Sequence, residues 1–167
     1  TGIKDDFHGV SSNKRFIFQI LVALIIAKVG GVWLEDLGSL ISVERLHLGI
    51  FSTVITVFAI VGVVNSLNFS DGIDGLSASL SLVTFISIAF FAFFAFGIEG
   101  NYAFEFVLLF IVAISAFLIF NLGLFVGSNF KIFMGDAGST FIGLGIAWAL
   151  ISFSQGHDLI FSPVTAL

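Results

Sequence analysis

The chain has 167 residues, of which 58% are hydrophobic and 10% charged, and its mean hydropathy is +1.17. A soluble domain carries about 25% charged residues, so this composition is that of a membrane protein. The net charge of -5 argues against a nucleic-acid partner, because phosphate backbones are bound by clustered Lys and Arg. The absence of cysteine excludes disulfides and thiolate metal sites.

Long apolar segments dominate the chain, and a helix needs roughly 20 apolar residues to cross a bilayer. We predict membrane helices at about 16–34, 48–64, 76–96, 104–126 and 139–153. Their apolar runs are continuous rather than alternating, which argues against a transmembrane β-barrel. Lys28, inside the first segment, is interpreted as a residue that reaches back to the membrane surface. The sequence therefore predicts an all-α, polytopic transmembrane helix bundle of about five helices.

Residues 1–167 are predicted to form a single, incomplete membrane domain. The chain begins without an initiator Met and stops at the approach to a further apolar segment, so we expect it to be a fragment of a longer protein. Consecutive crossings place segment 1–15 and two predicted loops, 65–75 and 127–138, on one side of the membrane. That side holds four basic residues, which are Lys4, Lys14, Arg15 and Lys131. The other side holds Arg45 alone. By the positive-inside rule, we predict that this side is cytoplasmic.

The same side is predicted to collect five carboxylates: Asp5, Asp6, Asp71, Asp74 and Asp136. Two like charges 4 Å apart repel by roughly 4 kcal/mol at an effective dielectric constant of about 20, so a cation should lie among them. Mg²⁺ suits the site best, because it takes carboxylate oxygens and also binds substrate phosphates, and Mn²⁺ is the alternative.

The segment NSLNFSDGIDGL, residues 65–76, carries two of these aspartates. Asp71 and Asp74 are three residues apart and would share one face if the segment were helical. An EF-hand loop is excluded, because Leu82 stands where its last ligand should be Glu. The alternative is a polar turn in which Asp and Asn cap the neighbouring helices.

A second segment, FMGDAGSTFIG at residues 133–143, places Asp136 just ahead of a predicted helix. Backbone N–H groups and the helix dipole at such a position favour an anion or an anion–metal pair. The alternative is an ordinary helix cap formed by an Asp or Ser side chain.

Three segments in this order, GIKDD at 2–6, NSLNFSDGIDGL at 65–76 and KIFMGDAGSTFIG at 131–143, resemble the polyprenyl-phosphate N-acetylhexosamine-1-phosphate transferases, which are glycosyltransferase family 4. Arg15 and Gln19 also look like that family's continuation after the DD pair. The final SPVTAL looks more like the undecaprenyl-phosphate N-acetylglucosaminyl type than the phospho-N-acetylmuramoyl-pentapeptide type. The resemblance implies a longer enzyme, with N-terminal helices and a histidine-rich cytoplasmic loop outside this chain.

The resemblance implies transfer of N-acetylglucosamine 1-phosphate from UDP-N-acetylglucosamine to undecaprenyl phosphate, with release of UMP. This would be the first membrane step of cell-surface polysaccharide synthesis, on the cytoplasmic face of a bacterial inner membrane. It implies Mg²⁺ as cofactor, a UDP-sugar and a polyprenyl phosphate as partners, and leaves a homodimer open. By resemblance, Asp136 holds the metal, the catalytic residues are Asp5, Asp6, Asp71 and Asp74, and the substrate-binding residues are Arg15, Asn65, Asn68 and Asn121.

Three other functions stay open at this point. The pentapeptide-transferase type would use another UDP-linked sugar. A cation-coupled secondary transporter would place its carboxylates near the middle of the bilayer and interrupt its helices. A purely structural membrane subunit would leave the aspartates on one side unexplained.

Overall fold

The computed structural model describes residues 11–38, 45–96, 102–123, 131–155 and 160–163. This part of the chain holds five long helices and one short 3₁₀ turn. They are α2 (Ser12–Lys28), η1 (Gly49–Phe51), α3 (Ser52–Ser70), α4 (Leu76–Phe96), α5 (Tyr102–Asn121) and α6 (Gly135–Ser154). Apart from an isolated bridge between Asp36 and His47, the described residues form no β-structure. The predicted all-α bundle is confirmed.

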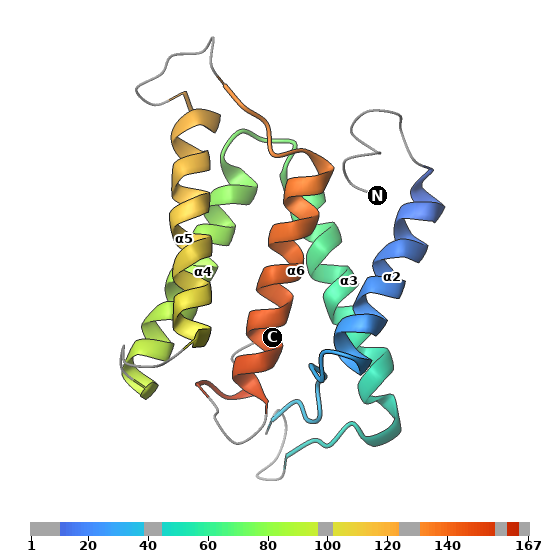
Figure 1. Ribbon diagram of the computed structural model, residues 1–167. Coiled ribbons are helices and arrows are strands. Elements are labelled where there is room, and N and C mark those ends of the chain that lie inside the picture. Colours follow the sequence, from blue (N-terminus) through green and yellow to red (C-terminus); the bar gives the residue numbers. More distant parts are fainter. Residues whose placement is uncertain (1–10, 39–44, 97–101, 124–130, 156–159, 164–167) are drawn as a thin grey trace.

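Helix α6 is the centre of the bundle, with α4 and α5 on one side and α3 and α2 on the other (Figure 1). Two glycines of α6 let its neighbours approach closely. A Cβ atom on Gly143 would lie 2.9 Å from the Cα of Val64 in α3, and one on Gly145 would lie 2.6 Å from the ring of Phe110 in α5. Because membrane helices associate through close packing of small residues, these positions seat α6 in the bundle.

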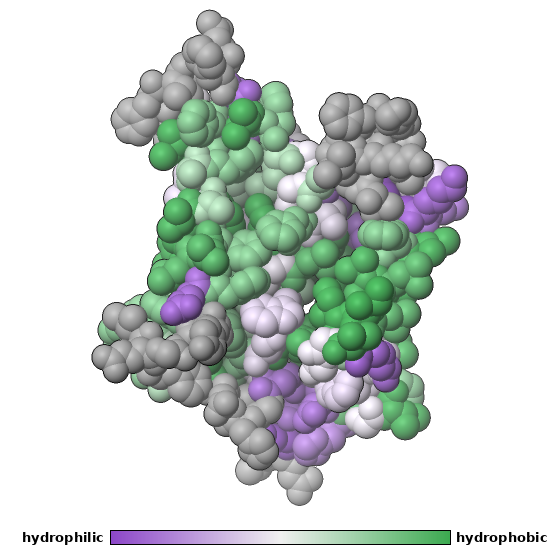
Figure 2. Space-filling model, viewed as in Figure 1, coloured by the Kyte–Doolittle hydropathy of each residue, from purple (hydrophilic) through white to green (hydrophobic). Residues whose placement is uncertain are grey.

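The surface of the described helices is largely apolar. Large side chains such as Phe58, Phe94 and Leu109 are 79%, 71% and 70% exposed, and Figure 2 shows the hydrophobic surface across the middle of the bundle. In the described part, four helices are long and apolar enough to cross a membrane: Gly49–Ser70, Leu76–Ala95, Phe104–Asn121 and Gly135–Ser154. Helices of this length and hydropathy identify the chain as an integral membrane protein.

The first helix, α2, begins and ends earlier than predicted. It begins at Ser12, which places Arg15 in its first turn rather than in a preceding loop. It ends at Lys28 because Gly31 takes a φ of 66°, a left-handed conformation that glycine adopts without steric cost. The result is a helix of 17 residues.

Helix α3 continues to Ser70, so the prediction that Asn65 and Asn68 lie in a loop is wrong. The sequence from Asn65 to Ser70 contains neither Gly nor Pro, and the hydroxyls of Ser66 and Ser70 bond to carbonyls one turn earlier. Polar residues at the end of a membrane helix can therefore stay helical when they lie at the membrane surface.

Helices α5 and α6 also differ from their predicted bounds. Helix α5 ends at Asn121, and positions 124–126 of the predicted helix lie outside the described residues. Helix α6 begins at Gly135 rather than 139, so Asp136 lies in its first turn. We call the end of the bundle where α2, α4 and α6 begin and α3 and α5 end the site end; it is uppermost in Figure 1.

Candidate functional site

Three helices meet near the site end through pairs of polar residues. Within each pair the residues are three or four positions apart, so both side chains lie on the same helix face. We call these six residues the polar seam: Arg15 and Gln19 of α2, Asn65 and Asn68 of α3, and Asp136 and Ser139 of α6.

Two contacts of the polar seam join α2 to its neighbours. The Arg15 guanidinium donates to Asp136 Oδ2 at 2.5 Å, and the two side chains are about one-third exposed, at 31% and 34%. One turn further along α2, the buried Gln19 accepts a hydrogen bond from Asn65 Nδ2 at 2.9 Å. An ion pair near solvent is screened, so the Arg15–Asp136 contact contributes little to stability.

Asn68 lies where α3 faces the first turn of α6. The buried Ser139 hydroxyl donates to Asn68 Oδ1, which leaves the amide nitrogen as the free end of that side chain. Asn68 Nδ2 is buried and finds no hydrogen-bond partner among the described residues. Because buried donors are nearly always satisfied, this atom calls for an acceptor that the described residues do not supply.

A groove of about 590 Å³ lies between the start of α2 and the end of α3. Arg15 and Asn65 supply polar groups to it, and Phe16, Ile17 and Phe69 supply apolar walls that are 51%, 58% and 87% exposed. The groove therefore combines a cationic side chain with an exposed apolar wall.

A second group of contacts joins α4, α5 and the approach to α6. Asn121, at the end of α5, is 5% exposed. Its Oδ1 accepts from the backbone N–H of Gly75 at 2.6 Å, and its Nδ2 donates to the carbonyl of Ile132 at 2.8 Å. Lys131 Nζ lies 2.8 Å from Asp74 Oδ2.

The structure brings several predicted residues together. Arg15, Asn65, Asn68 and Asp136 meet in the polar seam, whereas Asp74 and Asn121 belong to the second group. Asp71 directly follows α3, and the stretch from Asp71 to Asp74 is a turn, so the shared helical face does not form.

Two predicted residues, Asp5 and Asp6, lie outside the described part of the chain. Asn121 contacts two backbone groups rather than a neighbouring side chain. Its predicted role in substrate binding stays a prediction.

The carboxylates at the site end are the groups that could bind a metal ion. Among the described residues, no three His, Asp or Glu side chains converge on one point. Mg²⁺ is commonly held by one or two carboxylates, with phosphate oxygens and waters completing its shell. The hard oxygen donors of Asp71 and Asp136, at neighbouring helix ends, therefore fit such an ion in chemistry.

Three residues in these contacts have no predicted role in the site. Gln19 and Ser139 lie in the segments that resemble the family, and their helical spacing from Arg15 and Asp136 is a second signal. Lys131 entered only as a charge for orientation. Its position near Asp74 follows from the folding of the chain rather than from a local pattern.

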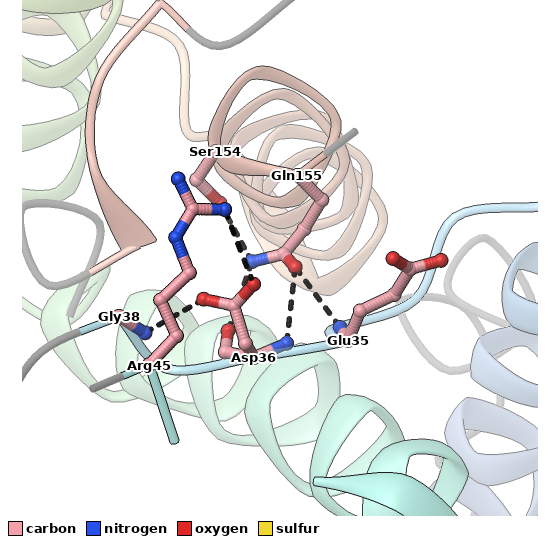
Figure 3. Close-up of polar contacts among 6 residues, drawn as sticks. All are labelled: Glu35, Asp36, Gly38, Arg45, Ser154 and Gln155. Atoms are coloured by element: carbon pink, nitrogen blue, oxygen red, sulfur yellow. Dashed lines mark hydrogen bonds and ion pairs between the residues drawn. The ribbon is translucent and has the colours of Figure 1, made fainter. Parts of the chain in front are cut away.

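The opposite end of the bundle also carries acidic residues: Asp36 pairs with Arg45 at 3.9 Å (Figure 3), and Glu35 accepts from the Trp33 indole at 3.1 Å. Gln155 Oε1 accepts from the N–H groups of Glu35 and Asp36 at 2.9 and 3.3 Å, and its Nε2 donates to the Asp36 carbonyl at 3.1 Å. The Asp36 carboxylate accepts from the N–H of Gly38 at 2.8 Å. These contacts tie the connection after α2 to the end of α6, and we interpret them as structural.

The chain is similar to named enzymes along almost its whole length. It is 39% identical over 167 residues to the undecaprenyl-phosphate alpha-N-acetylglucosaminyl 1-phosphate transferase of Haemophilus influenzae, and 42% identical over 166 residues to that of Pasteurella multocida. Each alignment covers 99% of this chain and 46% of the relative. The transferase of Yersinia pestis is 36% identical, over 99% of this chain and 44% of its own length.

The chain thus spans less than half the length of these relatives. The family model for glycosyl transferase family 4 matches residues 1–154. This match covers most of the chain and includes the aspartate segments and the polar seam. The chain belongs to glycosyl transferase family 4.

Proposed function

We propose that this chain is part of an enzyme that transfers N-acetylglucosamine 1-phosphate from UDP-N-acetylglucosamine to undecaprenyl phosphate. A lipid phosphate oxygen attacks the phosphorus that carries the sugar. The bond between that phosphorus and the oxygen of the uridine phosphate breaks, and UMP leaves. The products are a lipid-linked sugar diphosphate and UMP.

The observation that carries this proposal is the polar seam beside an apolar groove. Arg15 offers a donor to phosphate oxygens in the groove, where Phe16 and Phe69 form an apolar wall. The unpartnered Asn68 Nδ2 of the same polar seam is a second donor. Both substrates are anions, so catalysis consists mainly of positioning them and neutralising their charge.

Each residue has a stated role in this proposal. Arg15 exchanges its contact with Asp136 for a substrate phosphate, and Asn68 Nδ2 donates to a phosphate oxygen. Asp136 and Asp71 would hold Mg²⁺, which supplies charge neutralisation at the diphosphate when bound. Asn65, fixed by Gln19, borders the groove.

Asp5 and Asp6 are proposed to lie near the attacking lipid phosphate as bases, and Asp74 to help shape the site. A base is not strictly required, because a phosphate monoester with a second pKa of about 6 is largely a dianion at neutral pH. The site is proposed to face the cytoplasm, where UDP-sugars are made.

The experiment that tests the proposal uses the full-length protein in nanodiscs. UMP release is measured with a panel of UDP-sugars, undecaprenyl phosphate and Mg²⁺. The proposal expects UMP only when the lipid phosphate is present, with UDP-N-acetylglucosamine as the preferred donor. Cation flux into proteoliposomes without UMP release from any donor would refute it and favour a transporter.

A further inference from the structure

Asn121 lies between the two segments that carry the aspartates of the site end. On one side is the turn from Asp71 to Gly75, and on the other is the stretch from Lys131 to Met134 that leads into α6. One buried amide contacts the backbone of both, with an N–H donor at 2.6 Å and a carbonyl acceptor at 2.8 Å. Only a side chain with both an acceptor and a donor at its tip can make this pair of contacts.

We propose that Asn121 is a positioning residue that holds the Asp71–Gly75 turn and the start of α6 at a fixed separation. The inference rests on the proposed function for its meaning, because that separation would set how the carboxylates of the two segments meet one ligand. Asn121 acts here through the backbone of Gly75 and Ile132, and this role requires no contact with substrate.

The turn is shaped to accept the amide of Asn121. Gly75 has a φ of 76°, and a Cβ atom there would lie 2.6 Å from Leu122 Cδ2. The glycine therefore lets the turn pack directly on the end of α5. Its N–H stands just ahead of α4, where helix donors lack a partner within the helix, and Asn121 supplies the acceptor.

The other segment is tied at more than one point. The Ile132 carbonyl accepts from Asn121 four residues before Asp136. The Ser77 hydroxyl of α4 lies 3.8 Å from the sulfur of Met134, and Lys131 pairs with Asp74. The Lys131–Asp74 pair is 33% and 43% exposed, so it is screened and contributes less than the buried amide.

The variant Asn121→Asp is the sharpest probe of this role. It keeps the size of the side chain and the acceptor for Gly75, but it loses the donor and sets a carboxylate against the Ile132 carbonyl. The matched control is Gln155→Glu, which makes the same amide-to-acid change in a residue that also bridges backbone groups, at the opposite end of the bundle.

The first readout is a distance and does not depend on activity. Spin labels are attached at Ile73→Cys and Phe133→Cys, whose parent side chains are 65% and 77% exposed, in full-length protein that lacks other cysteines. Pulsed electron paramagnetic resonance then measures the distance between the two segments. We expect a narrow distribution in the parent and in Gln155→Glu, and a broadened or shifted one in Asn121→Asp. An unchanged distribution in Asn121→Asp would overturn the inference.

The second readout is the Mg²⁺ concentration that gives half-maximal UMP release. Residues that orient metal-binding groups typically change metal affinity or activity about 10- to 100-fold when replaced, so Asn121→Asp should raise this concentration by that factor. Gln155→Glu should leave it unchanged. A purely structural role would lower the amount of folded protein without moving the Mg²⁺ requirement, and that result would also overturn the inference.

Two further points keep the test decisive. If Asn121→Asp does not fold, Asn121→Ser takes its place, because the short hydroxyl cannot reach both backbone groups, and the same broadening is expected. If the parent releases no UMP from any donor, the proposed function fails, while the distance measurement still decides whether Asn121 fixes the two segments.

Discussion

At the scale of single residues, the site end holds two ion pairs that we propose a substrate or metal separates. Arg15 holds Asp136, and Lys131 holds Asp74, both in contacts that are partly open to solvent. Asn68 presents a buried donor without a partner in the described part of the chain. At the opposite end Arg45 pairs with Asp36 at 3.9 Å, and the amide of Gln155 bonds to backbone groups.

The first prediction concerns Asp136. Asp136→Asn in the full-length protein removes the charge proposed to hold the metal, and UMP release should fall by about 100-fold or more. Added Mg²⁺ should not restore it, because the ligand itself is lost. The control is Glu105→Gln, an exposed carboxylate in the first turn of α5 at the opposite end, which should keep its rate. Near-parent turnover in Asp136→Asn would remove the metal role.

The second prediction separates Asn68 from Asn65. Asn68→Asp keeps the acceptor for the Ser139 hydroxyl and replaces the unpartnered donor with a carboxylate oxygen. Its apparent affinity for UDP-N-acetylglucosamine should fall about 10- to 100-fold, as for loss of a hydrogen bond to a charged group.

Asn65→Asp serves as the comparison within the same helix. It loses the donor to Gln19 and to the Val61 carbonyl, at 2.9 and 2.7 Å, so it should lower the unfolding temperature. An Asn68→Asp protein that binds the nucleotide sugar normally would show that this amide does not contact substrate.

At the scale of helices, the position of the site depends on how closely α6 packs on α3. Gly143 of α6 lies against the backbone of Val64, one residue before Asn65 and four before Asn68. Close packing at this point brings Ser139 within reach of Asn68. The glycine therefore serves the geometry of the polar seam as well as the stability of the bundle.

The third prediction tests this packing with one substitution at two positions. Gly143→Ala places a Cβ atom 2.9 Å from the Val64 Cα, so it should destabilise the protein by about 1–3 kcal/mol, the usual cost of overpacking. Gly62→Ala, in α3, meets nothing within 4 Å and should be neutral or slightly stabilising. Unfolding by heat or denaturant measures both, and equal stability of the two variants would contradict this account of the α3–α6 contact.

The helices themselves could be predicted from the sequence, because continuous apolar runs are long and rare outside membranes. The helix ends could not. Asn65 and Asn68 were predicted to be a loop because they are polar, yet α3 continues through them and uses their amides for contacts with α2 and α6. An apolar window marks where lipid surrounds a helix, and it does not mark where the helix stops.

The candidate site, like the helices, could be predicted from the sequence only in part. The aspartates and Arg15 could be found because charges are scarce in this chain and stand out. The contacts of Gln19 and Ser139 could not be predicted, because they depend on which helices pack together. The roles proposed for Asp71, Asp74 and Asp136 stay predictions until they are measured.

At the scale of the whole molecule, the bundle places its substrate-binding candidates at one end of its apolar surface. A reaction between a soluble nucleotide sugar and a lipid phosphate needs a site at the membrane surface, open to water and to lipid. The groove between α2 and α3 has both polar and apolar walls at that end.

The fourth prediction concerns orientation. The excess of Lys and Arg predicts that the site end faces the cytoplasm. A membrane-impermeant maleimide added to intact spheroplasts should label Arg45→Cys at the opposite end and not Phe133→Cys at the site end, in full-length protein without other cysteines. Permeabilised cells, in which both positions should react, serve as the control. Labelling of Phe133→Cys in intact spheroplasts would reverse the assignment.

The central claim is that carboxylates from separate segments share one divalent cation where water meets lipid. Mn²⁺ binding by the full-length protein with UDP-N-acetylglucosamine, followed by electron paramagnetic resonance, tests it most directly. The account predicts one bound Mn²⁺ in the parent and in Glu105→Gln, with binding strongly weakened by either Asp71→Asn or Asp136→Asn. Undiminished Mn²⁺ binding in both aspartate variants would contradict it.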